Sequence, residues 1–276
     1  MAIRYKTRAF VFKKNNINES DRVFSVFTDN FGRLDIFAKA IRKTASKLRS
    51  GIDIFFMSEI EFIQGKSKKT LTDAVIIEKF DNITQDLEKF KIANRIGEIL
   101  DNFIKGEEKD ENIFNLINET FIKLNNYQFS FDASGRIPRR VLSNYQLLYY
   151  YFLWNVLSLL GYRPEVEKCA SCHEKLIPYN ISFSSKEGGI ICKKCLTSGF
   201  KQKIYPVKSA PQSGAVSREA GQFNRVNSDI VKILRIILSK DWQTLSKLKI
   251  EPSSQKLFEE ISEGYYLYIL SSHSFK

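Results

Sequence analysis

Apolar and polar positions alternate in short runs over the first 80 residues of the chain, which is the pattern of β-strands. Turn-forming residues separate the runs, as in Asp29-Asn30-Phe31-Gly32. The pattern predicts five strands, at residues 4–14, 22–28, 34–41, 52–64 and 71–80. Five strands with short turns, and one longer loop between the third and fourth, predict a small barrel. In a basic protein this favours an OB fold, although SH3-like and Tudor-like barrels have similar strand counts.

After Phe80 the apolar residues recur at helical spacing. The spacing predicts helices at residues 83–103, 113–124, 145–160, 230–238 and 257–270. Thr84 or Asp81 is the predicted cap of the first helix, and Gly161 with Pro164 ends the third. Because a helix that spans a membrane needs about 20 residues, we interpret 145–160 as a buried core helix and expect no membrane contact.

All four cysteines lie in two C-x-x-C pairs, Cys169 with Cys172 and Cys192 with Cys195. The first residues contain no apolar run of signal-peptide length, so we expect a reducing, cytoplasmic location, where such pairs favour a metal over disulfides or free thiols. Two tight knuckles with four thiolates predict a structural Zn²⁺ site, because four protein ligands leave no open position for catalysis. The Gly188-Gly189 pair suits a hairpin between the knuckles.

The segment C-A-S-C-H at residues 169–173 also has the form of a c-type haem attachment site. Attachment of haem requires export, which nothing in the sequence signals, and it leaves the second cysteine pair unexplained. Zinc is therefore the favoured cofactor.

Together these elements predict an α+β protein with an N-terminal five-stranded OB-fold barrel. An all-α helical domain follows, and it carries an inserted zinc-ribbon-like module. The predicted boundaries are 1–80 for the barrel, 81–165 for the first part of the helical domain and 166–199 for the module. Residues 200–276 contain a linker, rich in Ser, Gln and Gly up to residue 227, and the C-terminal helices that complete the helical domain.

Positive charge dominates the composition. Lys and Arg number 43 against 31 acids, a formal net charge of +12 with a pI near 9.4. This balance favours a polyanionic partner, either nucleic acid or an anionic membrane surface. Basic residues without acids cluster in the loop between the third and fourth predicted strands, and again at the next turn. The predicted DNA-binding residues are Lys39, Arg42, Lys43, Lys47, Arg49, Lys66, Lys68, Lys69, Lys193 and Lys194.

Two further features of these clusters stay open at the level of sequence. Lys193 and Lys194, with Lys168 and Lys175, lie beside the cysteines, where they either offset the charge of a four-thiolate zinc site or contact phosphate. Bases stack on aromatic side chains, and Phe24, Phe27, Phe31 and Phe37 are candidates in the barrel. With 22 phenylalanines in the chain, each is more simply explained as a core residue.

Evidence for an enzyme is thin. The sequence has no phosphate-binding G-x-x-x-x-G-K-[ST] loop, no G-x-G-x-x-G and no G-x-S-x-G. Only two histidines occur, one after Cys172 and one near the C-terminus, and the carboxylate cluster of a metal-dependent nuclease is missing. We therefore expect a binding protein without catalysis.

Several short motifs, in order, resemble the bacterial RecO family of recombination mediators. They are KTRAFVF at 6–12, ESDR at 19–22, FTDNFG at 27–32, AKAIRKTASKLR at 38–49 and LTDAVIIEKF at 71–80. LGYRP at 160–164 then leads into the cysteine pairs, as in zinc-bearing members. The family often has Gly where this chain has Asn18, Ala40 and His173, and its basic, Leu-rich C-terminus differs from YYLYILSSHSFK here.

This resemblance implies a nucleoid-associated DNA repair protein that binds single- and double-stranded DNA and anneals complementary strands without ATP. With its partner RecR, such a protein helps to load RecA onto DNA coated with single-strand-binding protein, SSB. The resemblance further implies that residues 39–49 face DNA and that the helical domain docks the acidic, Phe-ended tail of SSB. An RNA- or ribosome-associated zinc-ribbon module is the alternative, because it shares the charge, the barrel and the zinc.

Overall fold

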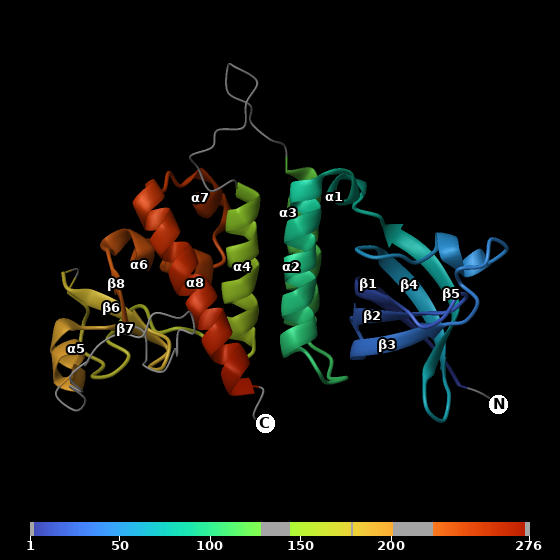
Figure 1. Ribbon diagram of the computed structural model, residues 1–276, viewed down its shortest axis with the longest axis horizontal. Coiled ribbons are helices and arrows are strands. Elements are labelled where there is room, and N and C mark those ends of the chain that lie inside the picture. Colours follow the sequence, from blue (N-terminus) through green and yellow to red (C-terminus); the bar gives the residue numbers. More distant parts are fainter. Residues whose placement is uncertain (1–2, 128–143, 178, 201–222, 274–276) are drawn as a thin grey trace, which may run out of the picture. The chain divides into compact units, whose positions relative to one another are not determined.

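Five strands form the N-terminal part of the protein in a computed structural model, which describes residues 3–127, 144–177, 179–200 and 223–273 (Figure 1). They are β1 (Arg4–Asn16), β2 (Arg22–Thr28), β3 (Gly32–Ala38), β4 (Met57–Gln64) and β5 (Lys69–Glu78). The strands close into a barrel in the order β1-β2-β3-β5-β4. All pairs are antiparallel except β3 with β5, which run parallel at Ile36↔Lys69 and Phe37↔Thr70. This five-stranded Greek-key barrel is the predicted OB fold.

The predicted end of the third strand and the predicted start of the fourth strand are both wrong. Strand β3 ends at Ala38 instead of residue 41, and β4 begins at Met57 instead of residue 52. Ile41 and Ile52 lie in the connecting loop, yet both are 2% exposed because they pack into the barrel core. An apolar residue in the sequence predicts that its side chain is buried, but not in which element. A loop that packs against the barrel buries such a residue as well as a strand does.

Strand β1 is buried on both faces. Ala9 and Val11 point into the barrel core, whereas Phe10 and Phe12 lie on the outer face and are also buried. The ring of Phe10 packs 4.3 Å, centroid to centroid, from that of Phe121 in the helical segment that follows the barrel. Burial on both faces explains why residues 9–12 form a continuous apolar run rather than a clean alternation.

Helices complete the first of two compact units, which extends through residue 156. After the short 3₁₀ helix η1 (Lys47–Ser50) in the β3–β4 loop come α1 (Asp81–Gln85), α2 (Leu87–Phe103), α3 (Glu111–Asn126) and α4 (Asn144–Leu159). The predicted helix from residue 83 is interrupted at Asp86, whose carboxylate accepts the backbone N–H groups of Glu88 and Lys89. The cap of the long helix is therefore Asp86 and not Thr84 or Asp81, because only its side chain reaches the free N–H groups of α2.

An ion-pair network fastens α2 to the barrel. The carboxylate of Asp101 lies 2.7 Å from the ammonium of Lys13 in β1 and 2.7 Å from the guanidinium of Arg33 in β3. Arg33 also donates to the backbone carbonyls of Asp101 and Ile104. Burial alone would raise the pKa of Asp101, but the hydrogen bond from Lys13 and the charge of Arg33 lower it below the ordinary value. The network thus orders the outer face of β3.

The second unit begins at residue 157 and contains a small sheet and further helices. Its elements are β6 (Ile181–Ser184), β7 (Gly189–Ile191), α5 (Lys193–Phe200), β8 (Phe223–Val226), α6 (Ser228–Leu238), α7 (Trp242–Lys247) and α8 (Pro252–His273). The strands pair antiparallel in the order β7-β6-β8, and Gly188 with φ +66° lies at the predicted hairpin. Strand β8 corrects the prediction of a structureless linker to residue 227, whose part at 201–222 lies outside the described residues.

Helix α4 matches the run of apolar residues predicted at 145–160. From Leu147 to Leu157 every side chain is buried, as expected of a core helix. Within the described ranges, no helix combines the length and the apolar character needed to cross a membrane. The prediction that the helices on either side of the cysteine module form one domain stays a prediction.

Candidate metal centre and nucleic-acid interface

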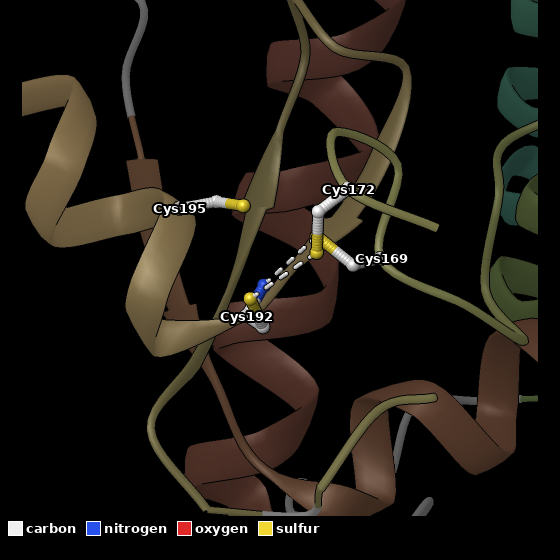
Figure 2. Close-up of side chains that lie close together, drawn as sticks. All are labelled: Cys169, Cys172, Cys192 and Cys195. Atoms are coloured by element: carbon white, nitrogen blue, oxygen red, sulfur yellow. Dashed lines mark hydrogen bonds between the residues drawn. The ribbon is translucent and has the colours of Figure 1, made fainter. Parts of the chain in front are cut away.

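The four cysteines converge on one point in the second unit (Figure 2). Their Sγ atoms all lie within 4.8 Å of one another, and those of Cys172 and Cys192 are 3.8 Å apart. Four sulfurs bound to one Zn²⁺ at about 2.3 Å, at the corners of a tetrahedron, would lie about 3.8 Å from each other. The cluster therefore has the dimensions and the donor set of a closed four-thiolate metal site.

The first cysteine pair occupies a tight turn. The N–H of Cys169 donates to the carbonyl of Glu174 at 2.9 Å, and the N–H of His173 donates to the carbonyl of Cys169 at 2.8 Å. The N–H of Ala170 donates to the carbonyl of Ile190 in β7 at 2.8 Å, which joins this knuckle to the sheet. Local hydrogen bonds thus hold both sulfurs of the pair on the same side of the turn.

The second pair lies at the start of a helix, which differs from the predicted second knuckle. The carbonyl of Cys192 accepts the N–H of Leu196, so Cys192 precedes the first turn of α5 and Cys195 lies within that turn. The N–H of Cys192 in turn donates to Sγ of Cys169 at 3.3 Å. A helix start brings residues i and i+3 to one face, so it presents two sulfurs at C-x-x-C spacing as a knuckle does.

The surroundings of Cys169 favour its thiolate. This side chain is completely buried, which by itself raises the pKa of a thiol. Hydrogen bonds from the backbone N–H groups of Cys172, Cys192 and Ser171 outweigh burial and lower the pKa of Cys169 to about 6. Thiolates are the ligands that Zn²⁺ takes in structural sites. Cys169, Cys172, Cys192 and Cys195 would hold such an ion, whose chemistry here is to cross-link the fold.

The lysines near the cluster surround it without entering it. Lys168 and Lys175 form a backbone bridge across the first knuckle, and both side chains are exposed. Lys193 and Lys194 lie in the first turn of α5 and are also exposed. All four can offset the formal −2 charge of a four-thiolate zinc site. A contact between Lys193 or Lys194 and phosphate stays a prediction.

The basic loop, residues 39–49, follows β3 directly and extends into η1 in the first unit. All five of its cations are exposed: Lys39, Arg42, Lys43, Lys47 and Arg49. Among the residues that the structure describes, none of the five forms a salt bridge with a carboxylate. A run of cations that acids leave uncompensated is the electrostatic requirement for binding phosphates.

An aspartate anchors the start of the basic loop. The carboxylate of Asp21, in the turn between β1 and β2, accepts the backbone N–H of Ala40 at 2.7 Å. This hydrogen bond, with that from Asn18, lowers the pKa of Asp21 below its ordinary value. The guanidinium and backbone N–H of Arg42 donate to the carbonyls of Asn18 and Ser20, respectively. Two of the motifs that are distant in sequence, ESDR and AKAIR, therefore form one structural unit.

Left-handed backbone occurs at two positions where the RecO resemblance anticipates glycine. Ala40, which the Asp21 anchor holds, has φ +54°, and His173, in the first knuckle, has φ +60°. A side chain in this region crowds the backbone, so it costs stability that glycine does not. The knuckle and the basic loop thus keep the turn geometry that glycine would favour.

We expect Ala40→Gly and His173→Gly each to raise the free energy of unfolding by about 0.5–1 kcal/mol, because relief of strain exceeds the added entropy of the unfolded chain. Ala45→Gly is the matched control in the same loop, since Ala45 is exposed and its φ is not positive. That control should lower stability slightly. Urea unfolding of the metal-loaded protein measures the free energy of unfolding of all three variants. A lower stability of Ala40→Gly than of the wild type would contradict the proposed backbone strain at Ala40.

The second basic cluster, at the β4–β5 turn, is less uniform than predicted. Lys66 is exposed, but Lys69 is half-buried and forms a 2.6 Å ion pair with Glu107. The ammonium of Lys68 lies over the ring of Phe37, 3.5 Å from its centroid. Lys105, which the sequence analysis did not single out, lines one groove together with Lys68, Lys69 and Phe37, because the end of α2 approaches this turn. No local pattern around Lys105 signals that approach.

Both basic clusters belong to the first unit, whereas the module lysines belong to the second.

The family model "Recombination protein O N terminal" matches residues 1–80, and "Recombination protein O C terminal" matches residues 84–276.

Curated relatives agree with these matches. The chain is 31% identical to the DNA repair protein RecO of Dehalococcoides mccartyi over 246 residues, which are 89% of this chain and 83% of that protein. It is 28% identical to the DNA repair protein RecO of Thermoanaerobacter sp. over 261 residues, 94% of this chain and 90% of that protein. Since both terminal models of one family together cover nearly every residue, the chain belongs to the RecO family of DNA repair proteins.

Proposed function

We propose that this RecO family member is a non-enzymatic, DNA-binding recombination mediator. It anneals complementary single strands and, with RecR, assists the loading of RecA onto SSB-coated DNA. The observation that carries the proposal is the basic loop, which combines five exposed cations with an OB-fold barrel in a DNA repair family. OB folds bind nucleic acid through a charged surface and stacked bases. We place the protein in the cytoplasm with the nucleoid.

The mechanism we propose is electrostatic. Cations of the basic loop and of the β4–β5 turn neutralise phosphates and release counterions, which lowers the repulsion between two strands. Strands held on one positive surface meet at a raised local concentration, and base pairing supplies the free energy. Such a mechanism uses neither ATP nor a catalytic residue. The Asp21 anchor contributes by holding the start of the basic loop in place.

Zinc is the metal we propose for the four cysteines, in a structural role only. It holds the first knuckle against the start of α5, so that the module keeps Lys193 and Lys194 on an ordered surface. We also propose that the helical part of the chain docks the acidic, Phe-ended tail of SSB, which brings the protein to coated DNA. RecR and RecA then act downstream of this recruitment.

Annealing of two complementary single strands tests the proposal, with the strands bare or coated with SSB and with no nucleotide present. We expect the purified protein to accelerate annealing in both cases, and its DNA affinity to fall steeply between about 50 and 200 mM salt. Binding without annealing, or an affinity that salt leaves unchanged, would contradict the proposal. A preference for structured RNA over single-stranded DNA would instead support an RNA-associated zinc-ribbon module.

A further inference from the structure

A groove of about 350 Å³ lies over the outer face of β3. We call it the β3 groove. Its lining includes Phe37 of β3, Gln64 at the end of β4, Lys68 of the β4–β5 turn, Lys69 at the start of β5, and Lys105 after α2. Every lining residue belongs to the first unit. Phe37 lies two residues before Lys39, the first cation of the basic loop, so the β3 groove lies on the strand that leads directly into this loop.

Phe37 presents an aromatic ring to the β3 groove. Apolar positions 34, 36 and 38 of β3 point into the barrel core, so the alternation of the strand places Phe37 outside, where it is half-buried. The rings of Phe24 and Phe27 are at most 1% exposed. Phe31 instead packs against the rings of Tyr5 and Phe62. Among the four phenylalanines that the sequence offered as stacking faces, Phe37 alone lines the groove.

A lysine covers this ring. The ammonium of Lys68 lies 3.5 Å from the ring centroid of Phe37, and the lysine side chain is exposed. Within the described ranges, Lys68 forms no salt bridge with a carboxylate. A cation–π contact at an exposed site is weaker than the stacking of a base on an aromatic ring. A base can therefore replace the ammonium on the ring, and the ammonium then becomes available to a phosphate.

The other charged groups of the β3 groove either already form an ion pair or a hydrogen bond, or are acidic. Lys69 forms its ion pair with Glu107, and Arg33 is bound to Asp101. Lys105 donates to the carbonyl of Asp101. The exposed carboxylate of Asp35 also lines the groove and repels phosphate. This distribution favours a neutral base in the groove and a phosphate near Lys68.

We propose that the β3 groove binds one unpaired nucleobase, stacked on Phe37, while Lys68 moves from the ring to an adjoining phosphate. The inference rests on the proposed function, which supplies a DNA strand along the basic loop. Bases inside a duplex have no free face for an aromatic ring to stack on. The β3 groove therefore distinguishes single-stranded from double-stranded DNA, which the cations alone do not.

Substitution Phe37→Leu in the full-length, metal-loaded protein tests the stacking. It keeps an apolar side chain over β3 but removes the flat ring. We expect the affinity for a single-stranded oligonucleotide to fall about tenfold, with the affinity for the same sequence as a duplex unchanged. The dependence on salt should also stay the same, because no phosphate contact is lost. Phe37→Tyr should restore binding to the single strand. Fluorescence anisotropy with labelled DNA at several salt concentrations measures all of these.

Phe31→Leu is the matched control, because it removes another half-buried ring of the barrel that does not line the groove; single-strand affinity should not change. Lys68→Ala should instead reduce the salt slope for single strands by about one phosphate contact. Equal loss of single-strand and duplex affinity in Phe37→Leu, or no loss, would overturn the inference while the annealing mechanism stands. If the wild-type protein fails to bind single strands, the proposed function and this inference both fall.

Should Phe37→Leu lower the melting temperature, Phe37→Trp provides a direct readout in a folded protein. Its added indole should be quenched by single-stranded DNA and not by duplex, relative to the wild-type background from the two native tryptophans. Quenching by neither form would reject stacking at position 37.

Discussion

Replacing Cys192 and Cys195 by serine is expected to abolish metal binding and unfold the cysteine module. Structural Zn²⁺ sites in small domains contribute about 10–16 kcal/mol of apparent binding free energy at neutral pH, which is comparable to the whole stability of a typical domain, about 5–15 kcal/mol. The sheet beside the cysteines is small, with strands of 4, 3 and 4 residues. A sheet of this size buries little apolar area of its own, so we expect it to depend on the cross-link that a metal would provide.

Metal content by mass spectrometry and thermal melting by circular dichroism measure the effect. Wild-type protein should hold one zinc ion per chain, and a strong chelator should reproduce the melting behaviour of the double serine variant. Lys193→Ala with Lys194→Ala is the matched control on the same helix start, and in the absence of a chelator it should still hold one metal ion per chain. An unchanged melting curve with full metal retention in the serine variant would reject a four-cysteine site.

The lysine control also separates the two roles left open for those side chains. If Lys193 and Lys194 only offset the thiolate charge, their loss should weaken metal retention in a chelator competition and leave DNA affinity unchanged. If they contact phosphate, DNA affinity should fall and the salt slope should decrease.

Local sequence patterns predicted the parts of the protein that local interactions determine. The strand at residues 22–28 was predicted with its observed ends, because apolar side chains on both faces of β2 make the run unmistakable. Likewise, the spacing of the four cysteines fixes which sulfurs share a turn, and they do converge. The clustering of the four cysteines was therefore predictable, even though the second pair lies on a helix start rather than in a knuckle.

Contacts between distant residues account for what the sequence did not reveal. Strand β8 is four residues long in a polar stretch, and it exists because it pairs with β6, about 40 residues earlier. In the same way, the sequence pattern places Ile41 in a strand, whereas in the structure it lies in a loop and packs into the barrel core. Propensity and periodicity describe only the immediate neighbours of a residue, so tertiary pairing overrides them at such sites.

Phe37 is an intermediate case. The alternation of Leu34, Ile36 and Ala38 already places it on the outer face of its strand, so the sequence contains the signal that separates it from Phe24 and Phe27. What the sequence lacks is the neighbourhood: Lys68 and Lys105 reach the same groove from a hairpin turn and from the end of α2. The candidate site thus depends on local pattern for its ring and on the fold for its charges.

Replacing Lys39, Arg42, Lys43, Lys47 and Arg49 together by alanine is expected to reduce DNA affinity by at least about a hundredfold near physiological salt. Each phosphate contact on single-stranded DNA contributes about 0.7 to the slope of log affinity against log salt, so five lost contacts should lower that slope by about 3.5. Salt titrations of binding, with the annealing rate measured in parallel, check both numbers. The fold should persist, because the five side chains are exposed and the backbone donors of Ala40 and Arg42 keep their bonds to Asp21 and Ser20. Only the exposed bond from the Arg42 guanidinium to Asn18 is lost.

A control variant with the same loss of charge decides whether the basic loop or the overall net charge of the protein accounts for the loss of DNA affinity. Lys79, Lys91, Lys109, Lys232 and Lys256 are exposed and lie outside both basic clusters. Their replacement by alanine removes five positive charges too, but it should cost much less affinity and leave the salt slope nearly unchanged, because a long-range field is screened beyond about 8–10 Å. Equal losses in the two variants would show that overall charge governs binding, and the basic loop would then not be the DNA site.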